Sequence, residues 1–212
     1  MTRRLIVWRH GETEHNVSGV FQGQLDTPLS QRGREQVATA AAELAARGPS
    51  RVVASDLARA ADTGRALAAV GALPIDLDAR FREIDVGSWS GRTHAQIERD
   101  HPQESRAVAR GEDVVRGDHG ERVADVAVRT AAAAADIAAA MTQDDLVVVA
   151  THGLAGRALV AGLLGWSQQQ AWRSLVGLRN AHWAELAEQD DQWRLVTWNT
   201  GVLTPALPSA TH

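Results

Sequence analysis

Short apolar runs alternate with segments of helical periodicity along most of this chain. The candidate buried strands are residues 5–8, 51–54 and 146–150, with 74–77 as a short strand or extended loop. Parallel neighbouring strands need a crossover connection, usually a helix. The alternation therefore predicts a three-layer α/β/α sandwich with a mostly parallel central sheet.

Capping residues and apolar spacing locate the helices between these strands. The predicted helices run from a Ser30 cap to about 47, from a Ser55 or Asp56 cap through Arg59, over 93–99, over 123–141, and from 153 to about 164. Residues 178–186 and 193–199 flank Asp190-Asp191 and predict a hairpin. The polar segment 101–120 is predicted to be a mobile loop that faces the substrate. We expect one domain over 1–212, with a loose tail from about 204.

Two of the predicted buried strands end at a histidine that is followed by glycine. Arg9-His10-Gly11 follows the first strand, and Thr151-His152-Gly153 follows the strand 146–150. Ligands of α/β sheets collect beyond the carboxyl ends of the strands. A neutral imidazole at His10 is a good nucleophile toward phosphorus, and Arg9 can hold phosphoryl oxygens. His152 could bind phosphate when protonated, and its charge would then lower the pKa of His10.

Two further side chains suit an anion site. Arg59 stands in the first turn of a helix that follows a strand, where the helix terminus already favours anions. Glu83 lies in a loop farther along the chain, and a carboxylic acid near a phosphate could protonate the leaving oxygen. Asp85 is the alternative acid.

The composition removes several classes of function. The 212 residues include no lysine, so neither a P-loop phosphate site nor a pyridoxal Schiff base can form. They include no cysteine, which excludes disulfides, thiolate zinc sites and cysteine nucleophiles. The net charge of −4 argues against bulk nucleic-acid binding. No apolar run has transmembrane length and no signal peptide is evident, so we expect a cytoplasmic protein without membrane contact.

The motifs, taken in order, resemble the histidine phosphatase (phosphoglycerate-mutase-like) superfamily. The residues that carry this resemblance are Arg9 to Thr13 with Asn16, Gln22-Gly23, Asp26 to Ser30 with Gly33, Ser55 to Thr63, Arg82-Glu83 with Gly87, Trp89 and Gly91, and Thr151 to Gly153. Each motif alone is weak, but their order covers almost the whole chain. The resemblance implies a phosphoglycerate-mutase-like fold and a phosphatase that needs no metal and no other cofactor.

The resemblance also assigns roles to individual residues. It implies that His10 is phosphorylated and that Glu83 donates a proton and later activates water. The other implied site residues are Arg9, Arg59 and His152 around the phosphate, and Asn16, Gln22, Gly23 and Gly153 as substrate contacts. The implied partner is a small phosphorylated substrate, and a homodimer is left open because many relatives are dimers.

Within the superfamily, the chain is most similar to the glucosyl-3-phosphoglycerate phosphatases. The cues are Gly91 to Ile97, Asn180 to Trp183 and Trp198-Asn199, whereas His119-Gly120-Glu121-Arg122 departs from that subgroup. The carboxylate of such a substrate could bind Arg116, His119 or Arg122, although solvated loop charges are the simpler expectation. The alternatives are a broad-specificity or α-ribazole phosphatase, a 2,3-bisphosphoglycerate-dependent phosphoglycerate mutase, and a non-catalytic module that binds a phosphate ligand.

Overall fold

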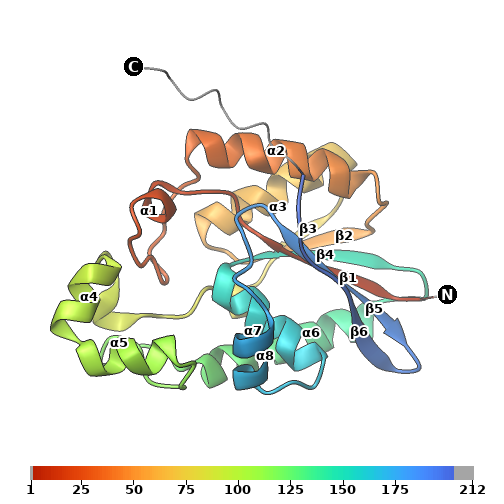
Figure 1. Cartoon of the computed structure of the whole chain (residues 1–212). Coiled ribbons are helices and arrows are strands. Elements are labelled where there is room, and N and C mark those ends of the chain that lie inside the picture. Colours follow the sequence, from red (N-terminus) through yellow and green to blue (C-terminus); the bar gives the residue numbers. More distant parts are fainter. Residues whose placement is uncertain (1, 203–212) are drawn as a thin grey trace.

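A six-stranded sheet runs through the middle of the molecule (Figure 1). The structure is a computed structural model that describes residues 2–202, so the predicted tail from about 204 lies outside the described residues. The strands are β1 (Arg4–Arg9), β2 (Arg51–Ala54), β3 (Ile75–Leu77), β4 (Leu146–Thr151), β5 (Trp183–Gln189) and β6 (Gln192–Thr200). Their order is β3-β2-β4-β1-β5-β6. The first four are parallel, β5 is antiparallel to β1, and β6 is antiparallel to β5.

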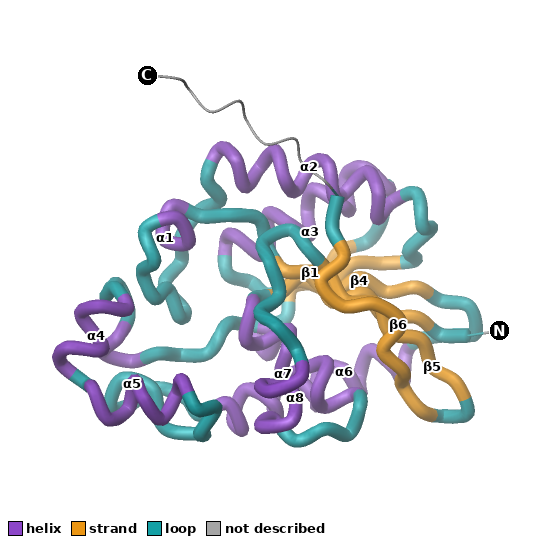
Figure 2. Tube along the Cα trace, viewed as in Figure 1, coloured by secondary structure: helices purple, strands orange, loops and turns teal. Residues whose placement is uncertain are grey.

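Helices cover both faces of this sheet, as the predicted sandwich requires. One face carries α2 (Gln31–Ala45) and α3 (Ala58–Gly71), and the other carries α6 (Val123–Ala140), α7 (Gly153–Leu163) and α8 (Gln168–Ser174). The short helices α1 (Glu14–Val17), α4 (His94–Asp100) and α5 (Pro102–Ala109) lie beyond the carboxyl ends of the parallel strands, on the side away from the N-terminus (Figure 2). Two 3₁₀ turns, η1 (Ala79–Phe81) and η2 (Gly87–Trp89), lie in the connection between β3 and α4.

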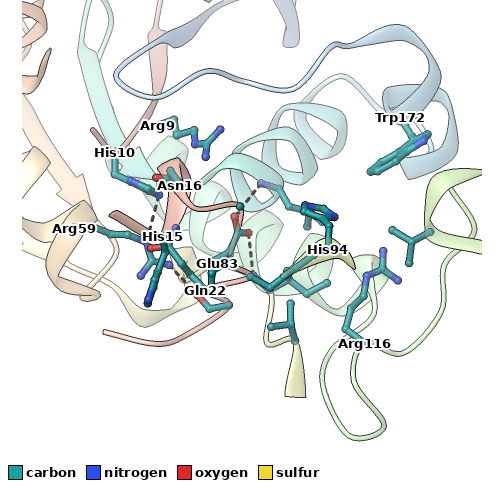
Figure 3. Close-up of a pocket in the computed structure, with 18 residues that line it drawn as sticks. Arg9, His10, His15, Asn16, Gln22, Arg59, Glu83, His94, Arg116 and Trp172 are labelled. Atoms are coloured by element: carbon teal, nitrogen blue, oxygen red, sulfur yellow. Dashed lines mark hydrogen bonds between the residues drawn. The ribbon is translucent and has the colours of Figure 1, made fainter. Parts of the chain in front are cut away.

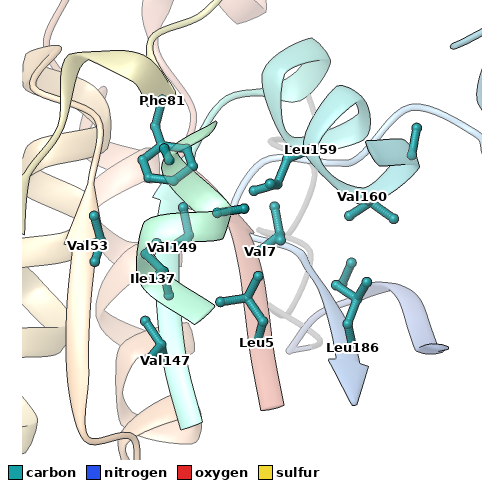
Figure 4. Packing of buried hydrophobic residues seen from close by; sticks show 14 of the residues in the cluster. Leu5, Val7, Val53, Phe81, Ile137, Val147, Val149, Leu159, Val160 and Leu186 are labelled. Atoms are coloured by element: carbon teal, nitrogen blue, oxygen red, sulfur yellow. The ribbon is translucent and has the colours of Figure 1, made fainter. Parts of the chain in front are cut away.

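The alternation of side chains along β1 divides the core between the two faces. Leu5 and Val7 pack toward α6 and α7, where Ile137 and Leu159 meet them (Figure 4). Ile6 and Trp8 point the opposite way into the cluster formed with α2 and α3. Successive strand residues face opposite sides of a sheet, so a strand buried on both faces is apolar throughout. This burial holds the carboxyl ends of β1 and β4 in fixed positions.

Two predictions about local structure are wrong. Segment 101–120 is not all loop, because α5 occupies its first half; only one residue of α5 is buried, and its eight residues include few large apolar side chains that would mark a helix in the sequence. Neither Ser55 nor Asp56 caps α3, whose N-cap is Leu57. Their side chains are engaged elsewhere: Ser55 is hydrogen-bonded to His152, and Asp56 forms an ion pair with Arg82.

The other predicted elements are confirmed, with small differences in their ends. The hairpin exists as β5 and β6, but its first strand begins at Trp183 and not at residue 178. The short helices α1 and α8 were not predicted; each begins at a capping box. Within residues 2–202, no helix combines the length and apolar character needed to cross a bilayer.

Candidate active site

The pairing of β1 with β4 brings the two predicted histidines together. Arg9 lies opposite Thr151 in the parallel register, so His10 and His152 leave the sheet side by side. Their ring centroids are 5.2 Å apart and both side chains are buried. The sheet therefore assembles two imidazoles that lie 142 positions apart in the sequence.

Hydrogen bonds fix the tautomer of His10. Its Nδ1 lies 2.6 Å from the carbonyl oxygen of Gly11, which can only accept, so Nδ1 carries the proton. Its Nε2 is then unprotonated, and the lone pair of this nitrogen accepts a hydrogen bond from the Nε–H of Arg59 over 3.3 Å. The lone pair therefore points toward a guanidinium group, on the side from which an anion would approach.

Arg59 is held by backbone carbonyls and not by an acid. Its Nη1 donates to Leu25 O over 2.7 Å and its Nη2 donates to Gly23 O over 2.8 Å. The side chain is 1% exposed, and burial lowers its pKa to about 10. Because carbonyls do not neutralise it, the guanidinium keeps its positive charge available to a ligand.

The pKa of His10 lies well below its usual range, first because of burial and then because of the charges of Arg59 and Arg9. Burial likewise lowers the pKa of His152, with the charge of Arg59 next in importance. Both rings are therefore neutral in the free protein. In the free protein, burial and the two arginines keep His10 neutral without a charge on His152.

Arg9 lies against the first turn of α7. Its Nη1 donates to Leu178 O over 2.5 Å, whereas its buried Nε has no partner among the described residues. A Cβ at position 153 would be 3.3 Å from Arg9 Cζ, so Gly153 allows the guanidinium to approach the helix terminus closely. The N–H of Gly153 is at the first helical position, where no carbonyl of the helix can accept it.

Glu83 lies at the same helix terminus. Its carboxylate accepts hydrogen bonds from the N–H groups of Leu154 and Ala155, over 3.1 and 3.0 Å, and from Ile84 N over 2.9 Å. Neither neighbouring arginine pairs with Glu83. Arg80 forms ion pairs with Asp78 and Asp136, and Arg82 forms one with Asp56. Glu83 therefore faces the cavity that contains His10 and is not a loop carboxylate paired with an arginine (Figure 3).

Asn16 and Gln22 use their carbonyl oxygens within the protein. Gln22 Oε1 accepts from Thr13 Oγ1 over 3.0 Å and from Thr27 Oγ1 over 2.5 Å, and Asn16 Oδ1 accepts from Asn180 Nδ2 over 3.1 Å. Both residues line the cavity, so their amide NH₂ groups are the ends that remain for a ligand. These donors suit phosphate oxygens.

Gly23 also lines the cavity, with φ of +51°. A Cβ at this position would lie 2.7 Å from Val86 Cγ2, and its carbonyl already accepts from Arg59. Gly23 therefore positions the arginine and leaves little room for a side chain of its own.

Sequence reasoning missed three residues that hold the site in place. Ser55 Oγ lies 2.9 Å from His152 Nε2, and Thr63 Oγ1 accepts from Gly11 N over 3.3 Å. Asn180 Nδ2 donates to His10 O over 3.1 Å. All three stand in segments that carry the resemblance, Ser55 and Thr63 in 55–63 and Asn180 in 180–183, but that resemblance gave them no role of their own.

A cavity of about 340 Å³, within the usual range for ligand pockets, is lined by seven of the predicted site residues, namely Arg9, His10, Asn16, Gln22, Gly23, Arg59 and Glu83. His152 is fully buried behind this lining. Arg116 lines its far side and is 4% exposed, so the expectation of a solvated loop charge is wrong for this residue. His119 and Arg122 are exposed, as that expectation has it. The cavity therefore combines Arg9, His10 and Arg59 at one end with a buried guanidinium at the other.

Comparison with known proteins gives consistent matches over nearly the whole chain. The family model described as the histidine phosphatase superfamily (branch 1) matches residues 5–201. Glucosyl-3-phosphoglycerate phosphatases of Mycolicibacterium vanbaalenii and Mycobacterium tuberculosis are each 39% identical, over 93% of this chain and 94% of theirs. A solved mycobacterial glucosyl-3-phosphoglycerate phosphatase in complex with VO₃ has a TM-score of 0.88 at 40% identity, covering 94% of this chain and all of that one.

Proposed function

The chain belongs to the histidine phosphatase superfamily, and we propose that it hydrolyses glucosyl-3-phosphoglycerate through a phosphohistidine on His10. It is a phosphoric monoester hydrolase, in keeping with the relatives named as phosphatases. One observation carries the assignment of the nucleophile. His10 is a neutral imidazole whose unprotonated Nε2 faces Arg59 at the carboxyl end of a parallel strand.

The first half of the reaction transfers the phosphoryl group to the enzyme. The lone pair of His10 Nε2 attacks phosphorus as the bond from phosphorus to the ester oxygen breaks. Arg9, Arg59 and His152 hold the phosphoryl oxygens, with further donors from Asn16, Gln22 and the Gly153 N–H. Such a transfer needs mainly positioning and stabilisation of negative charge, both of which this set provides. Protonated Glu83 gives its proton to the leaving alkoxide.

The second half returns the enzyme to its starting state. Glu83, now a carboxylate, accepts a proton from water as that water attacks the phosphohistidine. The N–P bond breaks, inorganic phosphate forms, and His10 Nε2 regains its lone pair. No step requires a metal, because the guanidinium groups supply positive charge and the imidazole of His152 and backbone N–H groups supply hydrogen-bond donors to the phosphoryl oxygens. We therefore expect turnover to persist after dialysis against EDTA.

The choice of substrate rests on the relatives and on the shape of the cavity. The two mycobacterial relatives named above are glucosyl-3-phosphoglycerate phosphatases. The cavity extends from His10 past Phe21, Val86 and Val108 to Arg116 and Trp172, which leaves space for an organic group beyond the phosphate. A leaving group that carries a carboxylate and a sugar suits that mixture of apolar and cationic lining.

Replacing His10 by asparagine tests the nucleophile. His10→Asn roughly preserves side-chain size and removes the nucleophilic nitrogen, so phosphate release should fall by at least about 10³-fold. His119→Asn removes an exposed histidine and is the matched control, which should keep wild-type activity. Acid-labile phosphate trapped during turnover should map to His10. Equal activity of His10→Asn and wild type, or trapped phosphate on another residue, would remove His10 from the mechanism.

A panel of phosphate esters tests the substrate. We expect the highest kcat/KM for glucosyl-3-phosphoglycerate, above sugar phosphates, nucleotides and α-ribazole phosphate. Equal values across the panel would indicate a broad-specificity phosphatase. Isomerisation of phosphoglycerate that depends strictly on 2,3-bisphosphoglycerate would indicate a mutase. Phosphate-ligand binding without turnover of any ester would indicate a non-catalytic module.

We further propose that the enzyme works in the cytoplasm and forms a homodimer. Cell fractionation tests the location, and light scattering coupled to size-exclusion chromatography tests the oligomer. Recovery in the membrane fraction, or the mass of a monomer at working concentration, would contradict these two parts of the proposal.

A further inference from the structure

Arg116 lies on the far side of the cavity from His10. Together with Trp172 it also lines an adjoining cavity of about 310 Å³, whose other charged lining residues are Arg157, Glu112 and Asp113. Figure 3 shows Arg116 and Trp172 opposite Arg9, His10 and Arg59. One ligand in the main cavity can therefore contact both His10 and Arg116.

Arg116 is buried without an acid of its own. Within residues 2–202, its side chain makes one hydrogen bond, from Nη1 to Val114 O over 2.7 Å, and no ion pair. The acid that acts on it, Asp113, accepts from Val123 N and Ala124 N at the start of α6. Burial lowers the pKa of Arg116. A buried cation that has no direct ion pair among the described residues, and whose one nearby acid accepts from backbone N–H groups, is only partly compensated, which favours an anion from outside the chain at this site.

Arg157 adds a second positive charge to the same region. Its guanidinium lies over the indole of Trp172, 4.2 Å from the ring centroid, and forms no ion pair among the described residues. Burial lowers the pKa of Arg157, the charge of Glu83 acts in the opposite direction, and the nearby charge of Arg116 lowers it. Two guanidinium groups that repel each other are thus held together, which favours a shared anion between them.

The backbone around Arg116 is fixed before any ligand arrives. Ser88 N donates to Gly117 O over 3.0 Å, and Glu121 N donates to Asp85 O over 2.9 Å. A Cβ at position 117 would lie 2.0 Å from Val86 O, and φ there is +51°, so only glycine allows this contact. The loop that carries Arg116 is therefore joined to the loop that follows Glu83.

We propose that Arg116 and Arg157 form an anion subsite that binds the carboxylate of the substrate's leaving group, a proposal that rests on the phosphatase function proposed above. Guanidinium groups suit a carboxylate because they donate in a planar fork. The other two sequence candidates do not fit this position. His119 is exposed, and Arg122 is exposed with its Nη1 donating to Asp113 O.

Two esters that differ at a single group test the subsite. 3-Phosphoglycerate has a carboxylate where glycerol 3-phosphate has a hydroxymethyl group. In Arg116→Met and in Arg157→Met, the ratio of kcat/KM for the first ester over the second should fall about tenfold, mainly through KM. Arg65→Met removes an exposed arginine that is paired with Asp62 and lines neither cavity, so it should keep the wild-type ratio.

A conservative variant separates charge from structure. Arg116→Lys keeps the positive charge and should recover part of the ratio that Arg116→Met loses. If Arg116→Met and Arg116→Lys lower kcat/KM by the same factor for both esters, Arg116 has only a structural role and the proposal is wrong. An unchanged ratio in both methionine variants would also overturn it.

Direct binding tests the subsite even if the protein turns over neither ester. We would titrate 3-phosphoglycerate and glycerol 3-phosphate into His10→Asn by calorimetry, with and without Arg116→Met. The proposal expects tighter binding of 3-phosphoglycerate, and loss of that difference with Arg116→Met. If Arg116→Met instead weakens only 2,3-bisphosphoglycerate, the subsite binds a second phosphate and the carboxylate assignment fails.

Discussion

Two buried histidines make the stability of this protein depend on pH. The pKa values of His10 and His152 are well below the ordinary histidine value, because burial and the charge of Arg59 oppose protonation. In the unfolded chain both rings are free to bind protons near pH 6.5. The unfolded state therefore binds more protons below that pH. Stability is fully present above pH 6.5 and is lost as the pH falls toward the folded pKa values.

The size of the loss follows from this linkage. For one histidine that stays neutral in the folded state, lowering the pH from 6.5 to 5.5 reduces the free energy of unfolding by about 1 kcal/mol. The two histidines together give about 2 kcal/mol. Carboxylates titrate mainly below this window, so the histidine contribution can be measured separately.

Urea denaturation at pH 6.5 and pH 5.5 measures the effect, in buffers free of phosphate and other oxyanions. The double variant His10→Asn/His152→Asn should lose about 2 kcal/mol less than the wild type over this interval. Val53→Ala is the control, because it destabilises the core without removing a titratable group. It should keep the wild-type dependence on pH.

One result would refute this reasoning. If the wild type and the double variant lose the same free energy between the two pH values, the buried histidines bind protons equally in both states. The neutral nucleophile inferred from the geometry would then lack its physical basis. A protein that unfolds without a single cooperative transition would show a changed denaturant slope, which the same experiment detects.

Three further predictions concern the site and its support. Because the pKa of His10 is lowered, kcat/KM should not fall between pH 7.5 and 6.5 through protonation of this ring; NMR that shows the His10 ring taking up a proton near pH 6.5 would contradict this. Gly153→Ala places a Cβ 3.3 Å from Arg9 Cζ and should lower kcat/KM about tenfold in steady-state assays, with little change in Tm. Arg129→Met removes bonds to the carbonyls of residues 80, 82 and 83 and to both Glu121 oxygens, and should cost about 3 kcal/mol in urea denaturation; a loss below about 1 kcal/mol would show that these groups find other partners.

Much of the candidate site was predictable because its residues stand at recognisable places along the chain. His10 and His152 each follow a buried apolar strand, and Arg59 lies in the first turn of a helix. Parallel strands end at one edge of a sheet, so such residues converge whatever the details of packing. Glu83 was placed near them by motif order, and the structure shows the helix terminus that it faces.

Hydrogen bonds between segments that lie far apart in the chain could not be predicted from the local sequence in the same way. Ala58 N at the start of α3 is capped by Asp26 Oδ1 over 2.6 Å, in place of the neighbouring Ser55 or Asp56. Asn180 reaches His10 from the loop before β5. A polar residue in a loop has the same local sequence whether water or another segment satisfies it, and so its partner could not be predicted.

The layers of the fold and the convergence of the histidines could be inferred before any coordinates, because hydrophobic periodicity and strand direction are local properties of the chain. The burial and protonation of individual groups could not be inferred in this way. Arg116 and Arg122 both stand in polar stretches of the sequence, yet one is buried in the cavity and the other is exposed. Burial depends on which segments pack against a residue, and those contacts exist only after folding.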